Sequence, residues 1–143
     1  MPVISQQFLI ALGLTVLALA VVVWTGVTHR RSPHYGAIVA LLGLLAWAIR
    51  EAELMGAGLI YEGASGVFRQ VHFVAVALTF LAIPLLAVTG TRLAKNPSNA
   101  HRKTHRKLGF AFVAIVLITS ALGTAMTLLA SAAPTNVSPA AGP

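Results

Sequence analysis

Four long runs of apolar residues, separated by short polar segments, dominate this chain. They cover residues 8–28, 35–55, 68–88 and 108–129. Each run is about as long as the roughly 20 residues that an α-helix needs to cross the hydrocarbon core of a bilayer. Lipid offers the backbone no hydrogen-bond partners, so such segments are expected to be helical. The pattern predicts an all-α, multi-pass membrane protein, a four-helix bundle within residues 1–130.

The C-terminal residues break this pattern. Residues 131–143 read SAAPTNVSPAAGP, which is rich in Pro, Ala and Ser and has no apolar period that could build a core. We expect them to form a flexible tail outside the membrane.

Composition excludes several other classes of protein. Hydrophobic residues make up 57% of the chain and charged residues only 9%, whereas soluble domains carry about 25% charged residues. Disordered chains are polar and poor in aliphatic residues, so disorder is excluded as well. The net charge of +7 reflects a shortage of acids, with only three Glu and no Asp. It therefore indicates a lipid bilayer as partner and no nucleic acid.

Side-chain chemistry narrows the possible activities further. The chain has no cysteine, which excludes disulfides, thiolate metal sites and covalent c-type heme. The sequence also suggests no Ser or Thr nucleophile with a His and acid partner, so no enzymatic activity is predicted.

The basic residues predict the orientation. Eight of the ten Lys and Arg fall in the 28–34 and 89–107 segments, which lie on the same side of a four-span protein. The positive-inside rule places this side in the cytoplasm and both termini outside (N-out/C-out). We therefore expect a cell inner (cytoplasmic) membrane, with anionic lipid attracted to the basic face by about 1 kcal/mol per basic residue.

These two basic segments also resemble each other. The first reads WTGVTHRRSPHYG, and the second contains AVTG and then AHRKTHRKLG. Each has a Thr-Gly at the end of one helix, a His-Arg-Arg/Lys triplet, a second His four or five residues later, and a Gly in the next helix. Either an internal repeat or the shared topology explains the match.

Histidine is concentrated in the same segments. The simplest interpretation is that its imidazoles contact the membrane surface together with the basic residues, and the alternative is ligand binding. A free divalent cation is disfavoured there, because the segments hold eight Lys and Arg and no carboxylate that could orient a ligand. The four histidines concerned are His29, His34, His101 and His105.

Heme b would satisfy both features of these segments. Its iron binds neutral imidazole, and its propionates bind Arg or Lys. The candidate cofactor-binding residues are these four histidines with Arg30 and Arg102. No histidine lies deep within a span, so such a heme would lie close to the cytoplasmic headgroups.

All three acids lie toward the opposite end. Arg50 and Glu53 are three residues apart on a helix, so an ion pair is expected. Glu51 points in another direction and needs a partner such as Arg69 or His72. Together these pairs would lock the second helix to the third. Alternatively, a metal or proton site is formed by Glu51, His72 and Glu62.

The stretch from THRRSPHYGAIVALLGLLAWAI to AHRKTHRKLGFAFVAIVLITSALG resembles small four-helix bacterial membrane proteins associated with heme–copper oxidase maturation. The common elements are a His-Arg in each of the two basic segments, a Gly-containing external loop before Arg69, and a Pro in the third helix. The resemblance covers about residues 28–130. It departs in the third helix, where those proteins tend to carry a histidine and this chain reads FVAVALTFLAI.

The resemblance implies an accessory or assembly protein of a respiratory or other electron-transfer complex, with heme or metal contact through histidines. Its partners would be subunits of that complex or further copies of this chain. Two alternatives remain open at this point: a b-type heme-binding electron carrier, and a component of a proton or ion pathway through Glu51 and His72.

Overall fold

The structure is a computed structural model that describes residues 5–28 and 30–132. Within that part the chain is almost entirely helical, which confirms the all-α prediction. His29 and residues 133–143 lie outside the described residues. The elements, in chain order, are α1 (Gln6–Val27), α2 (Arg31–Gly56), β1 (Leu59–Ile60), α3 (Gly63–Lys95), α4 (Asn99–Leu129) and β2 (Ser131–Ala132).

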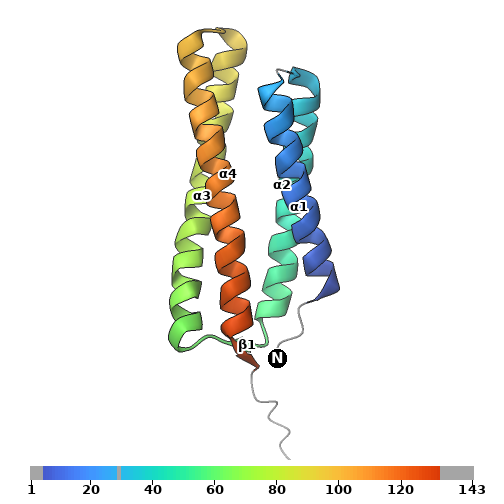
Figure 1. The fold of residues 1–143 in the computed structure, drawn as a ribbon, viewed down its shortest axis with the longest axis vertical. Helices are drawn as coiled ribbons and strands as arrows, with labels where there is room; N and C mark the ends of the chain where they lie inside the picture. The colour runs from blue at the N-terminus through green and yellow to red at the C-terminus, as the bar shows by residue number, and fades with distance from the viewer. Residues whose placement is uncertain (1–4, 29, 133–143) are drawn as a thin grey trace, which may run out of the picture.

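The helices form two antiparallel hairpins, α1–α2 and α3–α4, that stand side by side (Figure 1). The turns within the hairpins lie at one end of the molecule, and the α2–α3 connection lies at the other end. There β1 and β2 pair antiparallel, with Leu59 opposite Ala132 and Ile60 opposite Ser131. The predicted flexible tail therefore begins with two residues that pair in a strand, because the α2–α3 connection offers their backbone a partner.

Three of the described helices, α1, α3 and α4, are long and apolar enough to cross a membrane. Their large apolar side chains point outward: Leu17 is 60% exposed and Leu81 is 63% exposed. Such a surface is expected where lipid is the solvent, and it indicates a membrane protein.

Helix α2 is long enough, with 26 residues, but it is not among these candidate spans, so the prediction of four spans is supported for three. Its first turn carries Arg31, and charged residues return toward its end at Arg50, Glu51 and Glu53.

Two helices are much longer than the apolar runs that predicted them. Helix α4 begins at Asn99 rather than near residue 108, and α3 ends at Lys95 rather than near residue 88. At about 1.5 Å per residue, helices of this length exceed the roughly 30 Å of hydrocarbon. Hydropathy marks only the part inside lipid, while the polar turns continue the helix beyond it. The Ser98 hydroxyl caps α4 by accepting a hydrogen bond from the His101 N–H (3.2 Å).

A small apolar core joins the two hairpins midway along their length. It is formed by the buried side chains of Leu19, Leu41, Phe112 and Val116. Ile83 and Leu86 of α3 pack against this cluster, so all four helices contribute to it. Most other helix contacts are made within a hairpin, and this cluster is the main apolar link between the two.

We expect Phe112→Ala to weaken the union of the hairpins. The Phe112 side chain is only 7% exposed, and truncating it should lower the free energy of unfolding by roughly 2–4 kcal/mol through lost packing. Phe110→Ala is the matched control, because Phe110 is 52% exposed on the outer surface. Unfolding titrations in mixed micelles would measure both variants. Equal losses would contradict this assignment of the core.

Candidate functional site

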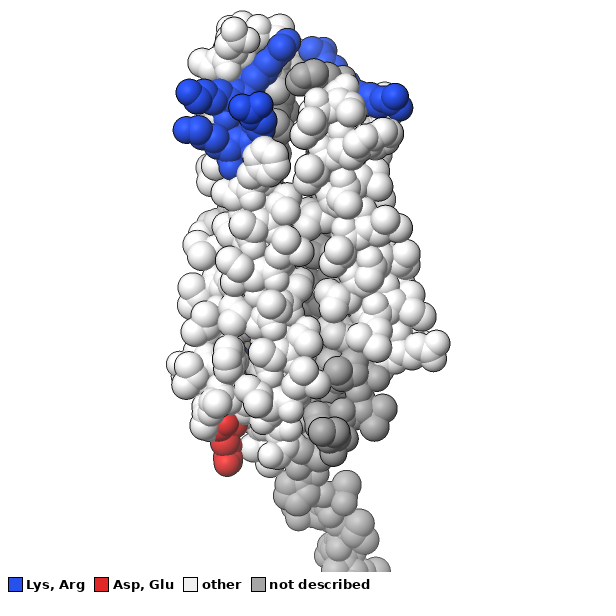
Figure 2. Space-filling model, in the orientation of Figure 1, with Lys and Arg blue, Asp and Glu red and all other residues white. Residues whose placement is uncertain are grey.

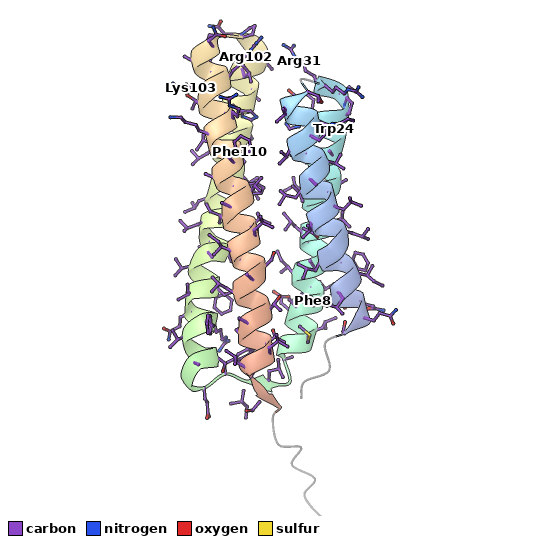
Figure 3. The ribbon with its side chains drawn as sticks, in the orientation of Figure 1. Phe8, Trp24, Arg31, Arg102, Lys103 and Phe110 are labelled. Atoms are coloured by element: carbon purple, nitrogen blue, oxygen red, sulfur yellow. The ribbon has the colours of Figure 1, made fainter. Side chains whose placement is uncertain are left out.

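The turn end of the bundle carries a dense positive charge. Lys and Arg gather there, and a Glu is visible at the opposite end (Figure 2). Arg31, Arg102 and Lys103 lie at this end with Trp24 (Figure 3). The guanidinium of Arg30 stacks over the Trp24 ring, 5.1 Å from its centroid. We call this region the basic end. Its Lys and Arg residues are Arg30, Arg31, Arg92, Lys95, Arg102, Lys103, Arg106 and Lys107.

In the first hairpin, His34 of α2 packs against the last turns of α1. Its Nδ1 atom lies 3.1 Å from the Thr25 hydroxyl oxygen and 3.1 Å from the Val22 carbonyl oxygen. A Cβ atom at Gly26 would lie only 3.2 Å from His34 Cε1. Glycine at position 26 therefore gives the imidazole the room to approach α1 closely.

The second hairpin repeats this arrangement. His105 of α4 places its Nδ1 atom 3.0 Å from the Thr89 hydroxyl oxygen of α3. A Cβ atom at Gly90 would lie 3.3 Å from His105 Cε1. The Thr-Gly and second-His positions that match in the sequence are therefore equivalent in space. We call each of these sets a His–Thr–Gly lock. The first lock comprises Thr25, Gly26 and His34, and the second comprises Thr89, Gly90 and His105.

The hydrogen bonds of the first lock determine which nitrogen of His34 carries the proton, because the Val22 carbonyl can only accept. Thr25 donates its only hydroxyl proton to carbonyls of α1, at 2.7 Å to Val21 and 3.1 Å to Val22. Its oxygen must therefore accept from His34 Nδ1–H, as does the Val22 carbonyl. The Thr89 hydroxyl can donate in the same way to the carbonyls of Leu85 and Leu86.

His105 Nδ1 contacts only the Thr89 hydroxyl, and the ring tautomer decides which of the two groups donates. In a neutral imidazole with a protonated Nδ1, the Nε2 atom carries a free lone pair. The Nε2 atom of His34 is therefore able to accept a proton or to bind a metal, and so is that of His105 in the tautomer whose Nδ1 donates to Thr89.

The two locks belong to different hairpins, and His34 is near enough to His105 for a charge on one imidazole to oppose a charge on the other. On the helices α1 and α3, Val22 and Leu86 follow one turn below the locks and pack against the apolar core. A pair of imidazoles from α2 and α4 thus lies between the basic residues and that core.

His101, the remaining predicted histidine within the described residues, is held elsewhere. His101 directs its Nδ1 atom to the Asn96 carbonyl oxygen (2.8 Å) and so belongs to the α3–α4 turn. His29 lies outside the described residues. Arg30 is engaged with Trp24, and Arg102 is exposed at the start of α4. Of the four predicted cofactor histidines, the structure brings together His34 and His105.

At the opposite end, the predicted ion pairing is partly wrong. Arg50 pairs with Glu51 (2.9 Å) instead of Glu53. Trp47 Nε1–H also donates to the Glu51 carboxylate (3.3 Å). Glu51 is 5% exposed and needs these partners because a buried charge without them is costly. Glu53 is exposed and has no such need.

The expected partners of Glu51 are engaged elsewhere. His72 donates its Nδ1–H to the Thr119 carbonyl oxygen of α4 (2.9 Å), and a Cβ at Gly123 would lie 3.0 Å from its Cε1 atom. His72 thus makes a third close contact between an imidazole and a glycine of the facing helix. Arg69 stacks over the rings of Tyr61 and Phe73.

The predicted metal site of Glu51, His72 and Glu62 is not assembled. Within residues 5–28 and 30–132, no three His, Asp or Glu side chains come close enough together to hold a metal ion. Glu51 is neutralised within α2, His72 is bound to α4, and Glu62 is exposed just before α3.

Sequence reasoning did not assign a role to the residues that position the imidazoles. Thr25, Gly26, Thr89 and Gly90 were visible only as members of a short repeat. The spacing of that repeat was the available indication, since each Thr-Gly lies where one helix of a hairpin faces the next.

Comparisons with protein-family models, curated proteins and solved structures found no match to this chain.

We expect Gly90→Leu to disrupt the second lock, because the added side chain would meet His105 from a Cβ position only 3.3 Å from Cε1. The matched control is Gly109→Leu, where an added Cβ has no neighbour within 4 Å. Thermal unfolding in detergent should show a clearly lower midpoint for Gly90→Leu than for Gly109→Leu. Equal midpoints would mean that the close approach at Gly90 does not matter for stability.

Proposed function

We propose that this chain is an integral membrane protein that binds heme at its basic end through His34 and His105. In this proposal it serves a respiratory or other electron-transfer complex as an accessory or assembly protein. The observation that carries the proposal is the imidazole pair: two equivalent hairpins each hold one histidine through Nδ1 against a threonine hydroxyl, and the two rings are near enough for their charges to oppose each other.

The donor chemistry supports heme over a free metal ion. Ligating histidines usually donate the second ring N–H to a neighbouring acceptor, which fixes the tautomer and the ring orientation. Thr25 supplies such an acceptor here, and Thr89 does so in the tautomer of His105 whose Nδ1 donates. Heme propionates need cationic partners, and Arg30 and Arg102 are among the eight basic residues at this end. The two turn segments contain no Asp or Glu that would repel the propionates or attract a divalent cation.

Each group of the chain has a separate task in this proposal. The His34 and His105 Nε2 atoms would hold the iron, and the two threonines would keep the rings in the binding orientation. The basic residues would neutralise the heme propionates. When bound, heme supplies one-electron redox chemistry. The apolar core below the locks would keep the cofactor near the headgroups.

The charge distribution supports an orientation with the basic end in the cytoplasm and both termini outside, in a bacterial inner membrane. The turns at the basic end are short, since only residues 28–30 and 96–98 separate the helices there. Partners would therefore meet this protein mainly within the membrane.

Absorption spectroscopy tests the heme site. We expect the purified protein, expressed with heme supplied, to show a Soret band and a reduced α-band. His34→Ala and His105→Ala should each lower bound heme at least about tenfold, because each removes an axial ligand. The matched control is His101→Ala, which should retain the bands because His101 belongs to the α3–α4 turn. A colourless wild-type protein would refute the proposal.

Deleting the gene for this protein distinguishes the proposed assembly role from the role of an electron carrier. In the assembly role, deletion lowers the heme content and the activity of the partner oxidase together, and heme transfers from this protein to the apo-oxidase. In the alternative of an electron carrier, the oxidase keeps its heme, while the heme of this protein is reduced and reoxidised during turnover. Unchanged oxidase heme content and activity after deletion would end the assembly role.

A further inference from the structure

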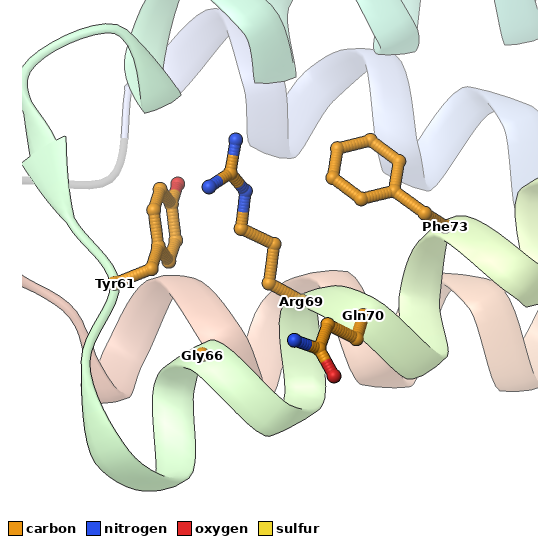
Figure 4. A pocket seen from close by; sticks show the side chains of 5 residues that line it. All are labelled: Tyr61, Gly66, Arg69, Gln70 and Phe73. Carbon is orange, nitrogen blue, oxygen red and sulfur yellow. The ribbon is translucent and has the colours of Figure 1, made fainter.

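Arg69 stands out at the end of the molecule opposite the basic end. Its guanidinium lies 5.0 Å from the centroid of the Tyr61 ring and 5.5 Å from that of Phe73. It therefore lies between two aromatic side chains (Figure 4). Within the described residues, the structure records no carboxylate at ion-pairing distance from Arg69. Arg50, at the same end, has such a partner in Glu51.

The surroundings of Arg69 form a small open cavity of about 180 Å³. Its lining residues are Tyr61, Gly66, Arg69, Gln70 and Phe73. Two glycines allow Tyr61 to sit there: a Cβ at Gly56 would lie 3.1 Å from the Tyr61 hydroxyl, and a Cβ at Gly66 would lie 3.3 Å from its carbonyl oxygen. The Ser65 hydroxyl caps the start of α3 by accepting from the Glu62 N–H (3.0 Å).

Stacking prepares the guanidinium for a particular type of ligand. A ring on its face restrains the plane of the group and leaves its N–H donors free at the edge. A planar set of N–H donors matches two oxygens of a phosphate or carboxylate, while a Lys ammonium does not. Gln70 also lines the cavity, but its amide points away from the guanidinium, so Arg69 supplies the N–H donors (Figure 4).

The position of Arg69 along α3 favours phosphate. Arg69 and Gln70 directly precede the long apolar stretch of α3, the part that is apolar enough to cross the membrane. The side chain therefore lies near the depth of the headgroups, in the leaflet opposite the basic end. Phospholipids supply phosphate groups at that depth.

We propose that the cavity of Tyr61, Arg69 and Phe73 is a phosphate-binding site, with Arg69 as the bidentate ligand of the phosphate oxygens. The phosphate is that of a membrane phospholipid or a free inorganic phosphate, and both offer the same oxygens to the guanidinium. The site is separate from the imidazole pair, so it does not depend on heme binding.

Paired Arg-to-Lys substitutions test this site. The full chain in an uncharged, phosphate-free maltoside detergent is mixed with phosphatidylglycerol, and retained lipids are counted by native mass spectrometry. Diacylglycerol with the same chains is the phosphate-free lipid control. Inorganic phosphate is titrated separately by calorimetry.

We expect Arg69→Lys to weaken phosphate binding roughly tenfold, since the charge remains while the bidentate geometry is lost. Arg50→Lys is the matched control and should leave it unchanged, because Arg50 is paired with Glu51. Thermal unfolding verifies that each variant is folded. Tyr61→Leu is a second variant that keeps Arg69 and removes one stacking ring, and it should weaken binding as well.

The outcomes separate the two sources of phosphate. If Arg69→Lys retains one phosphatidylglycerol fewer than the wild type while diacylglycerol is not retained, the ligand is lipid phosphate. If the lipid count is equal but inorganic phosphate binds in an Arg69-dependent way, the ligand is free phosphate. If Arg69→Lys and Tyr61→Leu match the wild type in both measurements, the proposal is overturned. The heme spectrum should be the same in all of these variants.

Discussion

The hydrogen bond between a histidine Nδ1 atom and the facing helix is the contact on which this bundle depends. It occurs in both hairpins at the basic end, at His34 and His105, and again near the opposite end, at His72. In each case a glycine lets the ring approach the neighbouring helix. Within a membrane such interhelical hydrogen bonds contribute about 0.5–2 kcal/mol each, and small residues permit the close packing that supports them. The same bond that joins the helices also restrains the orientation of the imidazole ring.

The sequence was sufficient for the helical architecture because apolar runs and basic segments are local features. It was less informative about the second helix, where Arg50, Glu51 and Glu53 reduce the apolar length, and about the polar turns that extend α3 and α4. Hydropathy identifies only the part of a helix that lies inside lipid, and it carries no information on where the helix ends in water. The pairing of β1 with β2 was not predicted, because two-residue strands that lie far apart in the sequence leave no recognisable pattern.

For the candidate site, sequence reasoning named four histidines of the basic segments, and the structure distinguishes among those it describes. Among the four histidines of the basic segments, it could not separate His34 and His105 from His101. That distinction depends on which helix each ring faces. Arg50 was assigned to Glu53 from helical spacing alone, whereas burial makes Glu51 the carboxylate that needs neutralising. Only tertiary contacts distinguish two acids that lie two residues apart.

The β1–β2 pairing has a consequence for how the molecule is completed. Each hairpin contains its own His–Thr–Gly lock, so α1 and α2 have the contacts to associate as soon as both have left the ribosome. Ser131 and Ala132 emerge last among the described residues, and they pair with the segment between the two hairpins. This pairing joins the end of the fourth helix to the segment between the hairpins, and it can form only after that last part of the described chain has been synthesised.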